Sequence, residues 1–332
     1  MTPYSLLDLV PVVQGGSVAQ SLANAADLAK HAERLGFTRY WTAEHHGMPG
    51  IASAATAVVL GHVAAATETI RVGAGGIMLP NHAPLLIAEQ FGTLDALFPG
   101  RIDLGLGRAP GSDQRVAQAM RRTLQSDPNA FPRDVLELQS YFADDGQTGI
   151  SATPGAGAKV DLWILGSSTF GAQLAAMLGL PYAFASHFAP DSLMDAIHIY
   201  RRDFKPSAVL DKPYLMAGFN VITADTDEEA EYLASSQQQA FVALRTGTPG
   251  RLPPPVRGYR ETLGVQGNAL LSHVLQCSAI GAPATVARGV GDFIERTGVD
   301  ELMLTSMMFD HDARKRSLEI AAAVMQDLKV AA

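Results

Sequence analysis

The fold is decided by residues 71–108, which read RVGAGGIMLPNHAPLLIAEQFGTLDALFPGRIDLGLGR. An apolar run at 71–79 and a second one at 101–107 flank a segment of helical period at 84–97. Pro84 suits the first turn of that helix, because its missing N–H would be unpaired there anyway. Short apolar runs joined by a helix are typical of parallel strands covered on both faces. The stretch therefore predicts one β–α–β unit.

The same alternation continues on both sides of this unit. It predicts further strands at 5–12, 38–44, 161–166, 182–186, 214–223 and 301–306, and further helices at 18–35, 52–66, 169–178, 190–204, 226–236, 283–297 and 310–328. About eight such units in one chain favour a single (β/α)8 TIM barrel with insertions, spanning residues 1–332. A doubly wound sheet followed by a second domain is the alternative.

The composition indicates a globular chain. Hydrophobic residues make up 47% and charged residues 17%, which is ample material for a core. The net charge of −8 argues against nucleic-acid and anionic-membrane partners. The single cysteine, Cys277, cannot form an intramolecular disulfide, and no Cys/His cluster resembles a zinc site, so no metal is expected. Without a basic N-terminal region or an apolar stretch of about 20 residues, a cytoplasmic location is expected.

Two stretches interrupt the alternation of strands and helices. Residues 144–158 are polar and small, and residues 237–268 contain the sequence RTGTPGRLPPPVRGY at 245–259. Stretches of this length inside a compact domain are usually linkers or functional lids. Because the second stretch precedes the last barrel unit, residues 237–268 are predicted to be an insertion that forms an active-site lid.

A candidate for catalysis stands at the end of the second predicted strand, in Glu44-His45-His46. In a TIM barrel, the C-terminal ends of the strands carry the active site. Adjacent residues on a strand point to opposite faces, so at most one imidazole faces the barrel axis, which argues against a two-histidine metal chelate. A histidine at this place suits a general base. The alternative is a structural histidine, hydrogen-bonded in the core or in a loop.

A glycine run, Gly73-Ala74-Gly75-Gly76, lies inside the third predicted strand. Glycines in a buried strand cost stability, and they usually mark a bulge or a close approach of the backbone to a ligand. A flat ring against the strand would explain the run. A bulge that serves only the packing of the barrel is the alternative.

Candidate anion-binding residues follow the fourth and fifth predicted strands. The run at 105–111 superficially looks like a dinucleotide-binding loop, but its glycine spacing and its place in the chain differ from that fingerprint. What remains is Arg108, a cation suited to a phosphate or an anionic ring, or alternatively to a salt bridge. Ser167 and Ser168 precede a helix, where hydroxyls and unpaired N–H groups form an anion site or a simple N-cap.

Taken together, four stretches resemble the bacterial luciferase-like flavin monooxygenase family. They are WTAEHH at 41–46, VGAGGIMLPNHAP at 72–84, GRIDLGLGR at 100–108 and GAPATV at 281–286. Their order and intervals match over nearly the whole chain, and the chain is similar in particular to single-subunit members of unassigned substrate. The resemblance implies a TIM barrel that binds FMN at the C-terminal mouth.

The resemblance also implies roles for individual residues. His45 would act in catalysis, as acid or base. The flavin ring would lie against a strand whose Gly75–Gly76 peptide bond is cis. The implied cofactor-binding residues are Ala74, Gly75, Gly76, Gly107, Arg108, the helix-borne Arg133, Gly166, Ser167 and Ser168. Two of them depart from luciferase, which has a reactive cysteine in place of Gly107 and an acid in place of Gly166. Valine at position 75 or 76 is expected to impair flavin binding far more than folding.

The implied reaction is the oxygenation of a small organic substrate. Reduced FMN, delivered by a separate NAD(P)H:flavin reductase, would react with O2 to give a flavin hydroperoxide that transfers one oxygen atom. The family further suggests a homodimer through the early barrel helices. Two alternatives on the same barrel stay open: a deazaflavin-dependent oxidoreductase and a non-catalytic FMN-binding protein. A metal hydrolase is disfavoured, because the first predicted strand has no His-x-His sequence.

Overall fold

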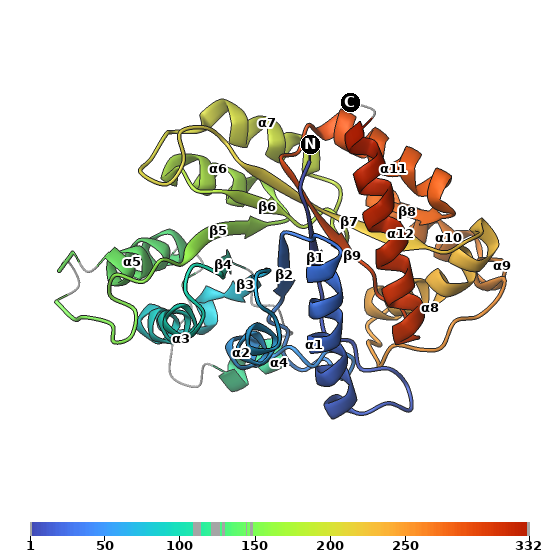
Figure 1. The fold of residues 1–332 in the computed structure, drawn as a ribbon, viewed down its shortest axis with the longest axis horizontal. Helices are drawn as coiled ribbons and strands as arrows, with labels where there is room; N and C mark the ends of the chain where they lie inside the picture. The colour runs from blue at the N-terminus through green and yellow to red at the C-terminus, as the bar shows by residue number, and fades with distance from the viewer. Residues whose placement is uncertain are drawn as a thin grey trace.

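The structure, a computed structural model, describes residues 2–108, 114–120, 127, 130–143, 145–146 and 149–330. Within these residues, eight parallel strands close into a barrel (Figure 1). They are β1 (Tyr4–Leu7), β2 (Arg39–Thr42), β3 (Arg71–Met78), β4 (Ile102–Gly107), β5 (Asp161–Gly166), β6 (Tyr182–Phe184), β7 (Leu215–Thr223) and β9 (Glu301–Thr305). The β6–β7 pairing closes the ring, and β9 lies between β7 and β1. The predicted TIM barrel is therefore confirmed, and the doubly wound alternative is wrong.

Helices follow the strands and surround the barrel (Figure 1). They are α1 (Val18–Arg34), α2 (Thr56–Ala66), α3 (Pro84–Leu97), α4 (Gln114–Met120), α5 (Phe131–Ala143), α6 (Thr169–Leu178), α7 (Leu193–Asp203), α8 (Asp227–Arg245), α9 (Tyr259–Thr262), α10 (Val265–Val274), α11 (Pro283–Thr297) and α12 (His311–Val330), with short 3-10 turns η1 (Leu79–Asn81) and η3 (Leu275–Cys277). Gly179 and Gly298, with φ of 63° and 58°, end α6 and α11 in the left-handed conformation that favours glycine.

Helix bounds agree with the sequence pattern where caps define them. The bounds predicted for α3, α6 and α11 are those of the structure. Helix α2 starts at Thr56 rather than at 52, because the preceding residues bind the loops of the first two strands: the Ala52 N–H donates to the Val10 carbonyl at 3.1 Å, and the Ser53 hydroxyl donates to the Ala43 carbonyl at 2.6 Å. Helix α8 continues to Arg245, nine residues beyond the predicted end.

A ninth strand within the described residues, β8 (Ser278–Gly281), lies outside the barrel ring and was missed by the sequence pattern. It pairs with β7 from Asn220 to Thr223, whereas β9 pairs with β7 from Met216 to Asn220. Since a strand has two edges, β8 lies on the edge of β7 opposite β9, in line beyond the end of β6. Strand β8 is only four residues long and ends in glycine, which left too little pattern to recognise.

Strand alternation divides the barrel residues between two apolar clusters. One cluster, packed between the barrel and the helices, includes Leu6, Tyr40, Ala74 and Leu104. The other, smaller cluster consists of Leu7, Trp41, Ala43, Trp163, Ala183, Met216 and Met303, one or two positions from each of six strands. Along each strand, the members of the second cluster alternate with those of the first, so their side chains point to the opposite face of the sheet. They therefore fill the barrel interior.

The floor of the barrel, at the N-terminal ends of the strands, is a buried network of charges. Arg39 donates to both oxygens of Asp103, at 2.8 and 2.9 Å, and to Glu301 at 3.1 Å. Arg71 and the Trp41 indole also donate to Asp103, at 2.8 and 2.9 Å. Burial would lower the pKa of Arg39, but the two carboxylates outweigh it and raise that pKa. These groups are fully paired and lie away from the mouth, so they stabilise the fold and leave chemistry to the other end.

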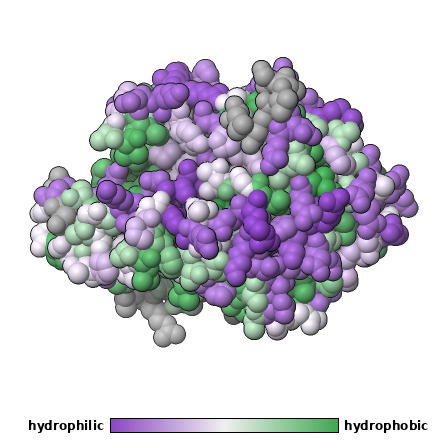
Figure 2. Space-filling view, in the orientation of Figure 1, coloured by the Kyte–Doolittle hydropathy of each residue, from purple (hydrophilic) through white to green (hydrophobic). Residues whose placement is uncertain are grey.

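The molecular surface is mixed in polarity. Figure 2 shows a face that is mostly hydrophilic, with apolar side chains in separate patches. Scattered exposed apolar residues of this kind are normal for globular proteins. Over the part of the chain that the structure describes, no helix combines the length and the apolar character needed to cross a membrane.

Candidate active site

The C-terminal ends of the strands bring several predicted site residues to one end of the barrel, beginning with His45. The inward row of β2 runs through Arg39, Trp41 and Ala43, and His45 is next in that alternation. Pairing with β3 continues past the end of β2, since the Glu44 N–H donates to the Gly76 carbonyl at 3.0 Å. His45 is half-buried. Burial, and to a smaller extent a positive charge on His45, lowers the pKa of His187, which lies in the turn after β6. His45 thus lies on the side of the chain that faces the barrel axis.

Glu44, pointing the other way, fixes this corner of the barrel. Its buried carboxylate accepts hydrogen bonds from the Met78 N–H at 2.9 Å, the Asn81 amide at 3.1 Å, and the imidazoles of His46 and His82 at 2.7 and 3.0 Å. Burial would raise the pKa of Glu44, but these hydrogen bonds, from His82 above all, outweigh it and lower that pKa. His46 and His82 are therefore engaged by a carboxylate, which leaves His45 as the histidine of this pair that faces inward.

The glycine run of β3 forms part of the inner wall. The Gly75–Gly76 peptide bond is cis, as the resemblance implies. A Cβ on Gly75 would lie 2.7 Å from the Trp41 ring, and one on Gly76 would lie 2.6 Å from the Gly105 carbonyl oxygen. Both glycines are thus required by the packing of the barrel itself. Valine at either position would therefore disturb folding as well, because both contacts are with neighbouring strands, and a larger effect on flavin binding stays a prediction.

Two other predicted wall residues take different positions. The side chain of Ala74 is fully buried in the outer cluster between barrel and helices, so only its backbone is on the inner side. Gly107 pairs with Met78, and a Cβ there would lie 2.9 Å from the Met78 sulfur, the flexible end of a side chain. A side chain at 107 would therefore be far easier to accommodate than one at 76.

Arg108 and the serine turn come together at the start of α6. The guanidinium of Arg108 lies 4.1 Å from the centre of the Phe170 ring, and Phe170 is in the first turn of α6. Ser168 is the N-cap of that helix, yet its side chain makes no capping hydrogen bond. Ser167 is exposed beside it, and Gly166 ends β5. A cation next to uncapped N–H groups at a helix N-terminus is the arrangement that binds phosphate.

Arg133 is the predicted phosphate ligand that the structure does not bring to this turn. It is exposed near the start of α5, a helix that packs against α3 and η1. No hydrogen bond or ion pair joins Arg133 to another described residue. Its role in phosphate binding stays a prediction.

Sequence reasoning missed a polar group at the opposite side of the mouth. His187, Asn220 and Gln237 come from the turn after β6, from β7 and from α8. The Asn220 amide donates to the His187 carbonyl at 2.6 Å and accepts from Gln237 at 2.9 Å. His187 lies in a turn beyond the end of β6, where strand alternation no longer predicts the direction of a side chain, so the sequence carried no signal for it.

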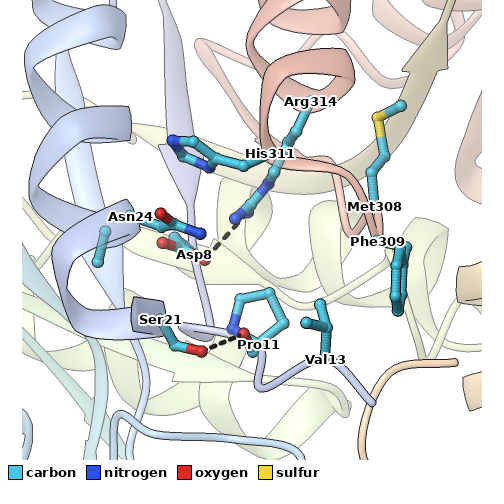
Figure 3. A pocket seen from close by; sticks show the side chains of 10 residues that line it. Asp8, Pro11, Val13, Ser21, Asn24, Met308, Phe309, His311 and Arg314 are labelled. Carbon is cyan, nitrogen blue, oxygen red and sulfur yellow. Dashed lines mark hydrogen bonds and ion pairs between the residues drawn. The ribbon is translucent and has the colours of Figure 1, made fainter. Parts of the chain in front are cut away.

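Two cavities lie outside the mouth. The first, bounded by β1, α1 and α12, is lined by Asp8, Asn24 and His311 and contains the buried ion pair between Asp8 and Arg314 (Figure 3). Its volume of about 20 Å³ has room for a single water and none for a flavin. The second, about 250 Å³, lies between α3 and residues 152–158, behind the helix layer. Among the described residues, no group of three or more His, Cys, Asp or Glu side chains could hold a metal ion.

Comparisons with known proteins agree with this geometry. The luciferase-like monooxygenase family model matches residues 5–301. A relative from Escherichia coli strain K12, named luciferase-like monooxygenase, is 52% identical over 326 residues, which cover 98% of this chain and 97% of the relative. The crystal structure of apo-MsnO8 superposes with a TM-score of 0.87 at 30% identity, covering 98% of this chain and 99% of that one.

More distant solved structures share the fold with different cofactors. One is the FMN complex of the oxygenating constituent of 3,6-diketocamphane monooxygenase from Pseudomonas putida, with a TM-score of 0.71, 17% identity, and 97% and 96% of the two chains covered. Another is an F420-dependent secondary alcohol dehydrogenase, with a TM-score of 0.68, 16% identity, and 96% and 97% covered. Since the family model spans most of the chain and the Escherichia coli relative matches nearly end to end, this chain belongs to the luciferase-like monooxygenase family.

Proposed function

We propose that this protein is an FMN-dependent monooxygenase that oxygenates a small organic substrate with O2. The observation that carries the proposal is the convergence of Arg108 with the uncapped start of α6, next to a strand wall built of glycines. A phosphate at that helix start and a flat ring along the wall are the two ends of FMN. A separate reductase would supply the reduced cofactor.

The residues present fit this cofactor. Arg108 and the N–H groups of α6 would hold the phosphate, with the hydroxyls of Ser167 and Ser168 beside them. The strands around the ring site carry no side chains at Gly75, Gly76 and Gly107, so backbone groups can approach a flat ring. Gly107 also removes the reactive thiol found at that position in luciferase, so a covalent or redox role for a cysteine is not part of the proposed chemistry.

Reduced FMN would supply the electrons that activate O2 and allow one oxygen atom to reach the substrate. The residues of this chain would do the rest. His45 faces the barrel axis and would hold or release a proton at the reacting centre. Glu44 would orient it indirectly, because its carboxylate accepts from the Met78 N–H of β3 and its own N–H donates to the Gly76 carbonyl.

Residues 237–268 are proposed as the lid that excludes water from this site. The structure gives these residues the end of α8, a loop, α9 and the first part of α10. The loop crosses to the mouth side of β1: the Leu252 N–H donates to the Val12 carbonyl at 2.9 Å, and the Gln14 N–H donates to the Leu252 carbonyl at 2.8 Å. A segment tied to the loop after β1 is suitably placed to cover the strand ends.

A homodimer in the cytoplasm is proposed as the working form. Three large apolar side chains are exposed on α2 and α3: Val58 of α2, by 74%, and Leu86 and Leu97 of α3, by 54% and 64%. Helices α2 and α3 are neighbours, so a partner over them would cover apolar surface that water now contacts. Light scattering of the wild type and of Val58→Lys would test the dimer.

Cofactor binding and turnover test the proposed function. Titration with FMN and with F420, followed by fluorescence, decides between the flavin and the deazaflavin alternative. Wild-type protein, a flavin reductase, NADH and O2 are then incubated with a substrate panel, and products are detected by mass spectrometry. His45→Ala should bind FMN like the wild type and lose product formation by about 100-fold or more, the usual contribution of general acid–base catalysis. Binding of F420 in preference to FMN, or full turnover by His45→Ala, would contradict the proposal.

A further inference from the structure

A second histidine faces the mouth of the barrel from the side opposite His45. Strands β2 and β6 are separated by β3, β4 and β5 in one direction and by β1, β9 and β7 in the other, so they stand across the ring from each other. His187 lies in the turn after β6, and its ring stands against Gly218 of β7, two positions after the inward-facing Met216. The two imidazoles therefore face the barrel interior from opposite walls.

The chain leaves room for the His187 ring. A Cβ on Gly218, in β7, would lie 2.1 Å from His187 Nδ1, so any larger residue would displace the imidazole. Gly218 has no unusual backbone angle to explain its presence. The imidazole of His187 occupies the space that a side chain at position 218 would take. Glycine is therefore needed at position 218 to accommodate this ring.

The backbone around the ring is held from three directions. The Asn220 amide donates to the His187 carbonyl at 2.6 Å, and the Ser186 hydroxyl donates to the Gly218 carbonyl at 2.6 Å. Arg245, at the end of α8, donates to the Phe188 carbonyl at 2.8 Å. These bonds use backbone groups and leave the imidazole itself uncommitted. The backbone fixes the position of the imidazole, and the imidazole forms no hydrogen bond within the described residues. It is therefore available to bind a ligand.

Neither ring nitrogen of His187 has a hydrogen-bond partner among the described residues, and Nδ1 is sealed from solvent. Burial, with a smaller contribution from a positive charge on His45, lowers the pKa of His187 to about 4. The ring is therefore neutral near pH 7. A buried nitrogen lone pair without a partner destabilises the fold less than a buried N–H without a partner. We therefore assign the acceptor role to Nδ1 and the proton to Nε2. His187 then offers one N–H donor on a half-buried residue.

Of the charged groups near the mouth that the structure describes, Arg108 belongs to the proposed phosphate site and the carboxylates are paired. Glu44 is occupied by four donors on the outer side of β2, and Asp103 and Glu301 are paired on the floor. Ala43, Ala183 and Leu165, just below the histidines, are apolar, and Asn220 and Thr305 are neutral and hydrogen-bonded to each other. A neutral donor above apolar walls discriminates against ions, because a charge would lose its hydration there without a counter-charge.

We propose that His187 is a substrate-binding residue that donates a hydrogen bond to an acceptor oxygen of an uncharged, largely apolar substrate held between it and His45. This inference rests on the proposed function, because it assigns the substrate class of the same site. The two histidines then have separate roles, since His45 handles the proton and His187 holds the substrate by its oxygen.

The test uses three probes of equal chain length: 2-decanone, decane and decanoate. Binding to the full-length protein is measured by saturation-transfer NMR in the wild type, in His187→Phe, and in His198→Phe as a control on the exposed face of α7. The wild type and the control should prefer 2-decanone over both other probes. His187→Phe should keep the affinity for decane and lose about fivefold for 2-decanone, the share of one neutral hydrogen bond.

Two further measurements guard against a merely structural effect. Nitrogen-15 NMR of labelled histidine at pH 7 should report an unprotonated Nδ1 in His187. Gly218→Ala should lose the preference for 2-decanone although His187 is intact, and the same change in a His187→Ala background should cost nothing more, because the ring it would displace is gone.

The outcomes separate this inference from the proposed function. Preference for decanoate, equal binding of all three probes, or no binding of any would overturn the substrate class, and an unchanged preference in His187→Phe would overturn the role of His187. FMN binding is measured on the same samples. If the protein fails to bind FMN but prefers 2-decanone, the monooxygenase is rejected and the ligand site is kept. If it binds FMN but shows no preference for 2-decanone, the monooxygenase is kept and the role of His187 is rejected.

Discussion

Replacing Glu44 with glutamine tests how the mouth of the barrel is held in shape. One carboxylate oxygen accepts from His46, Asn81 and His82, and the other accepts from the Met78 N–H and from His82. In Glu44→Gln, an NH2 group takes the place of one of these oxygens. If it faces Met78, it meets a backbone N–H that cannot reverse its polarity. If it faces the other side, it meets the Asn81 amide and two imidazoles, which must all turn into acceptors.

The expected cost follows from the number of bonds and their charge. A hydrogen bond to a charged acceptor contributes about 1.5–3 kcal/mol, and a neutral one about 0.5–1.5 kcal/mol. Weakening four bonds, with partial recovery as the imidazoles change tautomer, gives a loss of about 3 kcal/mol in the free energy of unfolding. Urea denaturation, followed by circular dichroism, measures this loss.

Glu33→Gln is the matched control. A single oxygen of Glu33 accepts the N–H groups of Glu68, Thr69 and Ile70, at 2.9, 2.5 and 2.8 Å. An amide oxygen can take over all three bonds, so the loss should stay near 1 kcal/mol. If Glu44→Gln lowers the free energy of unfolding no more than Glu33→Gln does, then hydrogen bonding to both carboxylate oxygens of Glu44 is not what stabilises the mouth.

The difference in stability between the wild type and Glu44→Gln should depend on pH, and the direction of the change follows from the pKa of Glu44. The pKa of Glu44 is lowered in the folded protein, since the hydrogen bonds, from His82 above all, outweigh burial. Such a group stabilises the fold above its unfolded pKa, about 4.3, and loses this contribution as the pH falls toward the folded pKa. The stability difference between the wild type and Glu44→Gln should therefore shrink as the pH falls from about 5 to below about 4, a window below the range in which imidazoles ordinarily titrate. A difference that grows within this window would contradict the assignment.

Three further substitutions are predicted from the structure. Asp103→Asn removes the charge that pairs with two arginines on the barrel floor, and it should cost about 3–5 kcal/mol in the free energy of unfolding, far more than Asp203→Asn in the surface pair with Arg202; equal losses would show that the floor network is not stabilising. Gly76→Ala places a Cβ 2.6 Å from a carbonyl oxygen of β4 and should cost about 3 kcal/mol in denaturant unfolding, whereas Gly250→Ala, with no atom within 4 Å of the new Cβ, should change stability by less than about 0.5 kcal/mol. Arg108→Ala should weaken FMN binding about tenfold in a fluorescence titration while the melting temperature stays the same, and an unaltered affinity would move the phosphate site elsewhere.

The sequence predicted the barrel well because its signals are local. Pro84 and Gly298 mark helix ends through their own backbone preferences, and they act the same way in any surroundings. The inward placement of His45 also follows from local alternation, continued from Trp41 and Ala43. The start of α2 was misjudged because Ala52 and Ser53 bind to distant loops, and no local pattern shows such a bond.

The candidate site was only partly accessible to the same reasoning. The roles suggested for Gly75 and Gly76 came from what a ligand would need, whereas the structure shows that Trp41 and the Gly105 carbonyl already require them. His187 and Gly218 are 31 residues apart in sequence, and their relation is visible only once β6 and β7 lie side by side. Sterics between strands that are neighbours in space but not in sequence were the missing information.

Strand β7 connects two parts of the protein that have different roles. Its first half belongs to the closed ring, and its second half carries β8 and with it the chain from α8 to α10. Asn220 is the one described residue that pairs with both β9 and β8, and its side chain reaches the His187 carbonyl, Gln237 and Thr305. A substitution at Asn220 would therefore disturb the barrel and the inserted segment together, because both are hydrogen-bonded to this one side chain.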